Sequence, residues 1–272
     1  LTRWWGVLPS ARAAVFAGSL APATIGGMGT TARPQARPPS WLLAEVASAG
    51  RENLDEAHVA RYDVKEDSGA AAEVAFLQGL GLDERSVVVD LGAGTGQFTA
   101  AVARVCARVV AVDVSPVMLR SLRSRVLSEG LANVEVVHAG FLTYDLLAPA
   151  AGADVAYSRY ALHHLPDFWK SQALVRVRAL LRPGGVFRLV DIVYDFDPAE
   201  APERIEAWCA TGGDESDVEA AWSRAELEEH VRDEHSTYTW LLEPMIERAG
   251  FTIEASSHTD DGIFASYVLR AV

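Results

Sequence analysis

Three glycines at alternate positions follow an apolar run that carries one acid. The stretch reads Val-Val-Val-Asp-Leu-Gly-Ala-Gly-Thr-Gly over residues 87–96, with Asp90 two residues before the first glycine. A glycine-rich turn after a strand lets the backbone approach a nucleotide closely, because a Cβ there would occupy the ligand's space. The pattern predicts a nucleotide-cofactor site whose members here are Asp90, Gly92, Ala93, Gly94 and Gly96.

A second acid, Asp113, ends the next apolar run. A carboxylate at the end of a strand offers two acceptor oxygens to a ribose diol. A nicotinamide-dependent oxidoreductase also has a glycine-rich first turn and such an acid, but its fingerprint is G-x-G-x-x-G. Here Gln97 and Phe98 stand where the third glycine of that fingerprint is expected, so the spacing disfavours this alternative.

Alternating strands and helices must position these acids. Strands are predicted over 86–91, 108–113, 134–138, 154–158 and 186–193, and helices over 97–107, 116–129 and 167–181. Buried β-branched strands that alternate with helices indicate a parallel sheet covered on both faces. A helix over 237–249 precedes two last strands, 251–257 and 262–269, whose short turn makes them an antiparallel pair.

In these motifs the chain resembles the class I S-adenosylmethionine-dependent methyltransferases, in particular the small-molecule group called methyltransferase type 11. The resemblance implies a doubly wound, mostly parallel, seven-stranded α/β sheet and S-adenosyl-L-methionine as cofactor. It implies that Asp90 and the glycine backbone hold the methionine part, and that Asp113 accepts both ribose hydroxyls. The further cofactor-binding residues expected are Val114, Ser115, Met118, Gly140, Phe141 and Ser158.

Gly140 departs from the family pattern. The family places an acid after the third strand to bind the adenine amino group, whereas this chain reads His-Ala-Gly-Phe-Leu over 138–142. The backbone around Phe141 and apolar packing remain available to hold the adenine. The departure lowers the expected cofactor affinity and keeps open a non-catalytic cofactor-binding protein.

The acceptor is expected near the end of the fourth strand. His163 and His164 are candidate general bases there, because imidazole titrates near neutral pH, although packing is the simpler role. Methyl transfer requires no obligatory catalytic residue, because the cofactor is already activated. The residues predicted to bind the acceptor are Tyr62, Arg159, Tyr160, His235 and Tyr238. Oxygen, nitrogen and carbon acceptors all remain open.

Two short clusters have the composition of metal ligands, Glu228-Glu229-His230 and Asp233-Glu234-His235. Both fall in an acidic helical stretch without cysteine, so the prediction is a solvated charged face, and no metal site is expected. The residues around His163 also lack the acid cluster that would hold magnesium.

The composition limits the class of partner. Among 272 residues, 24 basic and 37 acidic side chains give a net charge of −13, which disfavours binding to nucleic acid. The expected partner is a small molecule, and an RNA methyltransferase remains an alternative. Apolar runs are too short for a membrane span, and the two cysteines match neither a zinc site nor a secreted disulfide framework. A nucleotide-cofactor enzyme fits the cytosol, so a cytoplasmic protein is expected. The oligomeric state is not predicted.

The domain organisation follows from the composition along the chain. Residues 1–40 are predicted to be a disordered tail, and Met28 within them leaves the native start open. A single methyltransferase domain is predicted over 41–272. Its parts are a helical cap over 41–80, a cofactor-binding core over 81–193, a lid or acceptor segment over 194–235, and a final helix with a β-hairpin over 236–272.

Overall fold

The computed structural model describes residues 39–50, 53–65, 69–144, 152–213 and 222–272. Nearly all of the predicted tail lies outside these residues. No helix in this part of the chain is long and apolar enough to cross a membrane.

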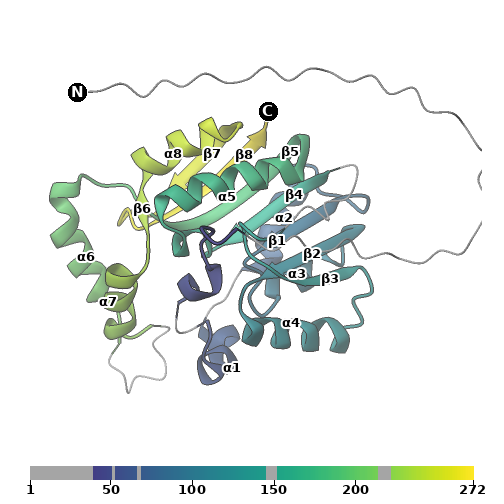
Figure 1. Cartoon of the computed structure of the whole chain (residues 1–272), viewed down its shortest axis with the longest axis horizontal. Helices are drawn as coiled ribbons and strands as arrows, with labels where there is room; N and C mark the ends of the chain where they lie inside the picture. The colour runs from purple at the N-terminus through teal and green to yellow at the C-terminus, as the bar shows by residue number, and fades with distance from the viewer. Residues whose placement is uncertain (1–38, 51–52, 66–68, 145–151, 214–221) are drawn as a thin grey trace, which may run out of the picture. The chain divides into compact units, whose positions relative to one another are not determined.

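A sheet covered by helices on both faces forms the centre of the described chain (Figure 1). Its strands are β1 Val87–Leu91, β2 Arg108–Asp113, β3 Val134–His138, β4 Ala153–Arg159, β5 Leu181–Tyr194, β6 Thr237–Tyr238, β7 Phe251–His258 and β8 Phe264–Ala271. The order is β3-β2-β1-β4-β5-β8-β7, and the short β6 pairs with the end of β5. β1 to β5 are parallel, and β8 is antiparallel to both β5 and β7. The predicted doubly wound sheet is confirmed, with β6 as an addition.

The helices divide between the two faces of the sheet. They are α1 Glu56–Lys65, α2 Ala70–Gly79, α3 Gln97–Val102, α4 Pro116–Ser128, α5 Asp167–Leu180, α6 Ala201–Cys209, α7 Arg224–Asp233 and α8 Thr239–Arg248, with short 3-10 turns at Glu45–Ser48, Leu162–His164 and Pro198–Glu200. Apolar residues of α2, α3 and α4 pack on one face, and those of α5 and α8 pack on the other. Because both faces are buried, β1 and β2 are almost continuous runs of valine.

Two helices begin or end differently from the prediction. The first, α3, ends at Val102 instead of continuing to 107, because the following carbonyl groups of Ala103 and Cys106 accept hydrogen bonds from the Asn133 amide. The second, α8, begins at Thr239, because the preceding two residues pair with β5 as strand β6.

The segment after β5 forms a hydrophobic cluster of its own. This cluster consists of Ile192, Tyr194, Trp208, Cys209, Leu227 and Ile263. It packs α6 and α7 together at one end of the sheet, on the left of Figure 1. Sequence patterns predicted a lid or acceptor segment over 194–235, with an acidic helical stretch in its last part. Ser223 starts α7 with a capping box, in which its side chain and that of Glu226 each accept the other's backbone N–H.

The strand order reverses direction between β1 and β4. From β1 the chain continues to β2 and β3 on one side, and β4 and β5 extend the sheet on the other. Beyond the carboxyl ends of such strands the loops diverge and leave a crevice, which is where ligands bind in open α/β sheets. The acids predicted to bind a cofactor stand at this edge.

Candidate functional site

The turn after β1 can only be built from glycine at its first position. Gly92 has a φ of 75°, and a Cβ added there would overlap the side chain of Ala161. The N–H of Gly94 donates a 2.8 Å hydrogen bond to Oδ2 of Asp113, which joins the turn to the end of β2. The turn therefore leaves an open cradle at the carboxyl ends of β1 and β2.

Asp113 lies at the bottom of this cradle, 8% exposed. Besides Gly94, the N–H of Ser115 donates to its Oδ1 at 2.7 Å. An ionised carboxylate has about four lone-pair positions, so these two bonds leave about two for a ligand. Burial raises the pKa of Asp113, although the two backbone hydrogen bonds oppose the shift.

Asp90 is more deeply buried, with 2% of its surface exposed. Its Oδ2 accepts a 2.5 Å hydrogen bond from the hydroxyl of Thr99. Burial raises the pKa of Asp90 to about 7, and the nearby charge of Asp113 adds to the increase. With this pKa, the Asp90 carboxyl group changes its charge near neutral pH.

The structure brings most of the predicted cofactor residues into one cleft. The predicted residues that line it are Asp90, Gly92, Ala93, Gly94, Asp113, Val114, Ser115, Met118, Gly140 and Phe141. Gly96 does not line it, because this glycine packs against Leu122 of α4. Ser158 does not line it either, because its side chain is fully buried within β4.

Glu45 occupies the place where sequence analysis found an acid missing. A Cβ built on Gly140 would overlap the Glu45 carboxylate. That carboxylate accepts hydrogen bonds from the N–H of Leu142 at 3.0 Å and the hydroxyl of Thr143 at 2.9 Å. Glu45 is 7% exposed and lines the cleft, and burial raises the pKa of its carboxyl group despite these bonds. The sequence prediction did not include this residue.

A larger cavity adjoins the cleft, with a volume of about 280 Å³. Its apolar wall consists of Ile192, Trp208, Trp222, Leu227 and Phe264. The cavity and the cleft share the side chains of Asn53, Tyr62, Tyr160 and His164. Cleft and cavity are therefore two parts of one continuous depression.

Tyr160, at the boundary of the two parts, has an unusual backbone. Its φ of 51° lies in the left-handed region, which is the one such value for a residue other than glycine in the described chain. Its N–H donates to the carbonyl of Val190 at 2.9 Å, which holds this conformation. Residues held in sparsely populated conformations cluster at functional sites.

The comparisons with known proteins agree with this geometry. A profile described as a methyltransferase domain matches residues 88–185. An uncharacterized methyltransferase of Anoxybacillus flavithermus is 30% identical over 168 residues, which cover 62% of this chain and 70% of that protein. The chain belongs to the class I S-adenosylmethionine-dependent methyltransferases.

A second relative of this methyltransferase is matched over a shorter stretch, and a solved structure shares its fold. An uncharacterized methyltransferase of Mycobacterium bovis is 37% identical over 106 residues, 39% of this chain, and the match spans only 50% of that relative's length. A solved S-adenosylmethionine-dependent methyltransferase from Aquifex aeolicus has the same fold, with a TM-score of 0.54 and 17% identity over 79% of this chain and 98% of that one.

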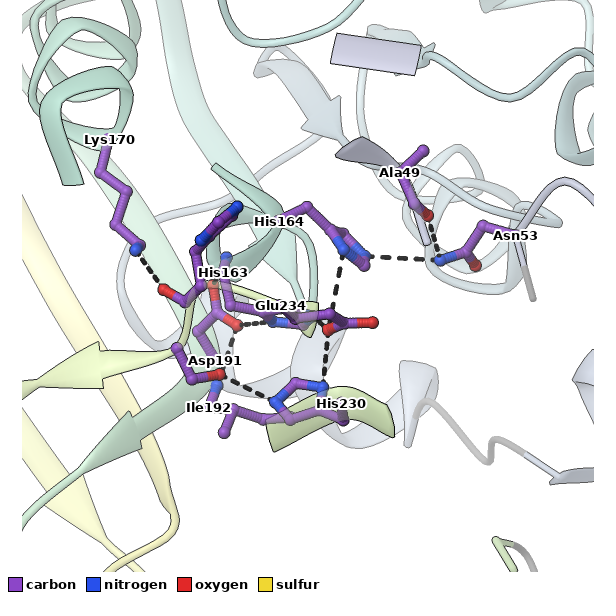
Figure 2. A network of polar contacts seen from close by, with 11 residues as sticks. Ala49, Asn53, His163, His164, Lys170, Asp191, Ile192, His230 and Glu234 are labelled. Carbon is purple, nitrogen blue, oxygen red and sulfur yellow. Dashed lines mark hydrogen bonds and ion pairs between the residues drawn. The ribbon is translucent and has the colours of Figure 1, made fainter. Parts of the chain in front are cut away.

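In this methyltransferase the two predicted histidines lie in a polar cluster, which Figure 2 shows. Nε2 of His163 is 3.0 Å from Oε2 of Glu234, and Nδ1 of His230 is 2.6 Å from the same oxygen. Nδ1 of His164 lies 3.7 Å from it. Behind His163, Oδ1 of Asp191 lies 2.5 Å from Nδ1. We call these five residues the histidine–glutamate cluster.

The pKa values in this cluster are far from those of free imidazole. Burial alone would lower the pKa of His163, but the carboxylates of Asp191 and Glu234 outweigh it and raise the pKa to about 10. Burial, followed by the charge of His163, lowers the pKa of His164 to about 3. Ion pairs with His163 and His230 lower the pKa of Glu234, although burial alone would raise it. Neither predicted base has a pKa near neutrality.

The expectation of a solvated charged face is wrong for two members of the acidic clusters. The side chains of His230, in the last turn of α7, and of Glu234, the residue that follows α7, are only 11% and 13% exposed. They are four residues apart, so they lie on one face of the helix. They line the cavity, as does Glu229.

Three predicted acceptor residues lie elsewhere. Arg159 lines the cofactor cleft instead of the cavity. The side chain of His235 is exposed, and its carbonyl group accepts a hydrogen bond from Lys170. Tyr238 packs among Tyr194 and Phe196, with ring centroids 5.7 and 5.8 Å apart. Neither His235 nor Tyr238 lines the cavity.

Proposed function

We propose that this protein transfers a methyl group from S-adenosylmethionine to a small molecule bound in the 280 Å³ cavity. The observation that carries the proposal is the shared wall, since Tyr62, Tyr160 and His164 line both the cavity and the cofactor cleft. A molecule in the cavity would meet the cofactor at this boundary. When bound, the cofactor supplies a methyl group that is already activated for displacement, so the chain's main tasks are positioning and water exclusion.

The cleft offers a partner for each part of the cofactor. Asp113 keeps about two lone-pair positions for the ribose hydroxyls. Asp90 and Arg159 line the end of the cleft beside the glycine turn and provide opposite charges for the ammonium and carboxylate groups of the methionine part. Glu45 provides a buried acceptor for the adenine amino group in place of the acid missing at Gly140.

The lining of the cavity suits a compact acceptor with an apolar body. Two tryptophans and Phe264 offer flat apolar surfaces, and histidines and acids supply the polar part of the lining. Glu226, Glu229 and Glu234 also line the cavity, and three acids oppose the entry of a phosphate backbone. A small molecule is therefore preferred over RNA as the acceptor.

A general base in the histidine–glutamate cluster stays a prediction. His163 and His164 both line the cavity, as such a role requires. A base works best when its pKa lies near the operating pH. The pKa values of His163 and His164, about 10 and about 3, do not meet that condition. We therefore expect water exclusion and positioning of the acceptor to contribute more to catalysis than proton transfer does.

The acceptor cavity is tested by Trp208→Ala. A panel of small molecules and short RNAs is screened with the wild-type protein for release of S-adenosylhomocysteine. With the acceptor found, the variant should lower kcat/KM about tenfold or more, because a truncated buried aromatic loses packing with the ligand. The dissociation constant of S-adenosylmethionine should not change, because Trp208 does not line the cofactor cleft. Equal loss of cofactor binding would contradict the assignment of the two parts, and turnover on RNA alone would replace the small-molecule proposal.

Cofactor binding should depend on pH through Asp90. A cationic methionine part favours the ionised carboxylate, whereas in the free protein a pKa of about 7 leaves Asp90 protonated at lower pH. Affinity should therefore fall as the pH drops from 7 to 5, by up to about tenfold per unit, since binding must then release a proton. Calorimetry in buffers of different ionisation enthalpy measures that release. Asp90→Asn should bind more weakly at pH 7 and lose most of the pH dependence, and an unchanged profile would sink the assignment.

A further inference from the structure

The three imidazoles of the histidine–glutamate cluster are arranged alike. Each has its outer nitrogen against a polar group: Nδ1 of His163 is 2.5 Å from Asp191, Nε2 of His164 is 3.4 Å from Asn53, and Nε2 of His230 is 2.8 Å from the hydroxyl of Ser236. The inner nitrogens, which are Nε2 of His163 and Nδ1 of the other two, all face Oε2 of Glu234. Proteins commonly orient a metal-binding histidine through a hydrogen bond from the ring nitrogen that does not bind the metal.

The close approaches of His163 and His230 to Glu234 are ion pairs, without the geometry of hydrogen bonds. Oε2 of Glu234 and Nδ1 of His164 are both buried, and neither has a hydrogen-bond partner in the described chain. Oε2 nevertheless lies 3.0 Å from Nε2 of His163 and 2.6 Å from Nδ1 of His230. Unsatisfied buried polar atoms are costly, so three imidazole nitrogens that converge on one carboxylate oxygen, with Nδ1 of His164 left without a hydrogen bond, indicate an absent ligand.

We propose that His163, His164 and Glu234 bind a divalent transition-metal ion, for which Zn²⁺ is the probe, in the wall of the acceptor cavity. One donor atom from each of the three residues lies within 4.8 Å of the others. Tetrahedral Zn²⁺, with bonds of about 2.0–2.1 Å, holds its donors about 3.3 Å apart. The distances of 3.0 and 3.7 Å from Oε2 to the two imidazoles lie on either side of that value.

Donor type and charge also fit a divalent cation. Two imidazoles and one carboxylate form a donor set that catalytic zinc sites use while keeping a position open. Asp191 and Glu234 bring two carboxylates into a site whose side chains are at most 14% exposed. One divalent ion balances both charges when neutral His163 is its ligand, so metal binding releases the proton of that ring to solvent. Asp191 holds the outer nitrogen of His163, which fixes the nitrogen that faces the metal. Nδ1 of His230 stands beside the same oxygen as a candidate further donor.

The position of the proposed metal site indicates which class of ligand it would bind. All four of His163, His164, His230 and Glu234 line the acceptor cavity, so an open position on the metal would face that cavity. A metal there would take a hydroxyl, thiol or carboxylate group of a bound molecule. On the proposed function, an acceptor hydroxyl or thiol would lose its proton to solvent when bound to the metal, and its oxygen or sulfur would then form the bond to the methyl group as the cofactor's carbon–sulfur bond breaks.

The test is a metal titration of tag-free protein that has been treated with EDTA and dialysed. Zn²⁺ in calorimetry should bind in a single equivalent, and Co²⁺ should produce the visible d–d band of a nitrogen- and oxygen-ligated site. Glu234→Gln, which keeps the size of the side chain, should weaken Zn²⁺ binding at least about tenfold. Asp191→Asn, which changes the group behind His163 without removing a metal ligand, should weaken it about 10- to 100-fold.

His235→Ala is the matched control. His235 follows Glu234 directly, but its side chain is exposed and outside the cluster, so this variant should bind Zn²⁺ as the wild type does. Folding is checked separately, because Zn²⁺ should raise the Tm of the wild type and of this control and EDTA should reverse the shift. Zn²⁺ binding that is no tighter in the wild type than in Glu234→Gln would overturn the proposal and leave a hydrogen-bonded cluster. Cofactor titration without metal tests the proposed function independently.

Discussion

Asp113→Ala is expected to weaken S-adenosylmethionine binding roughly 100-fold. The variant removes charge-assisted hydrogen bonds to two ribose hydroxyls, and a loss of about 3 kcal/mol corresponds to that factor. It also releases the N–H of Gly94, which Asp113 holds at 2.8 Å, so the glycine turn loses its connection to β2. Calorimetric titration of the cofactor and of S-adenosylhomocysteine into both proteins measures the effect.

A carboxylate on the strand next to β2 provides the control. Glu135 lies on the neighbouring strand β3, pairs with Arg108 and lines neither the cleft nor the cavity. Glu135→Ala should leave the dissociation constant unchanged. Asp113→Asn should fall between wild type and Asp113→Ala, because it keeps one acceptor oxygen. Tight binding by Asp113→Ala in a folded protein would contradict the assignment of the ribose site.

Glu45→Ala is expected to weaken cofactor binding about 10- to 100-fold, because the adenine amino group would lose a charged acceptor. A modified ligand distinguishes a purely structural role of Glu45 from a role in binding the adenine amino group. The wild type should prefer S-adenosylhomocysteine to its inosine analogue, which has an oxygen in place of the amino group. If Glu45 accepts from that amino group, Glu45→Ala should lose the preference, and an unchanged preference would refute the role.

A second substitution at Gly140 sharpens this test. Gly140→Asp alone should destabilise the protein, because its side chain would overlap Glu45. The double variant Glu45→Ala with Gly140→Asp removes the overlap and restores the acid in the position that the family uses. It should bind the cofactor more tightly than Glu45→Ala does, and so show strong non-additivity. Additive losses would mean that the two positions do not share one function.

The sheet and the cofactor cleft could be predicted from sequence because their signals are local. The valine runs, the glycine spacing and the acids Asp90 and Asp113 all lie within about one β-α-β unit. Among the predicted cofactor residues, only Ser158 and Gly96 do not line the cleft, because Ser158 is fully buried in β4 and Gly96 packs against Leu122. Arg159, which was predicted to bind the acceptor, lines the cofactor cleft.

The other half of the site depends on contacts between distant segments. Glu45 reaches the end of β3 from a 3-10 turn, and nothing in its neighbouring residues indicates that contact. Glu234 meets His163 only because α7 packs at the end of β5. One local signal was available there, since His230 and Glu234 are four residues apart on a helix and therefore share a face. The surrounding acids obscured it by suggesting a solvated face.

The separate hydrophobic cluster around Trp208 and Leu227 bears on how this protein evolves. The apolar residues that line the proposed acceptor cavity belong to that cluster or pack against it, whereas the cofactor cleft rests on the larger clusters beneath the sheet. Substitutions around α6 and α7 therefore alter the acceptor cavity at little cost to the cofactor-binding strands. Descendants of such a chain could acquire new acceptors by drift in one peripheral segment, while the part shared with the family at residues 88–185 stays nearly constant.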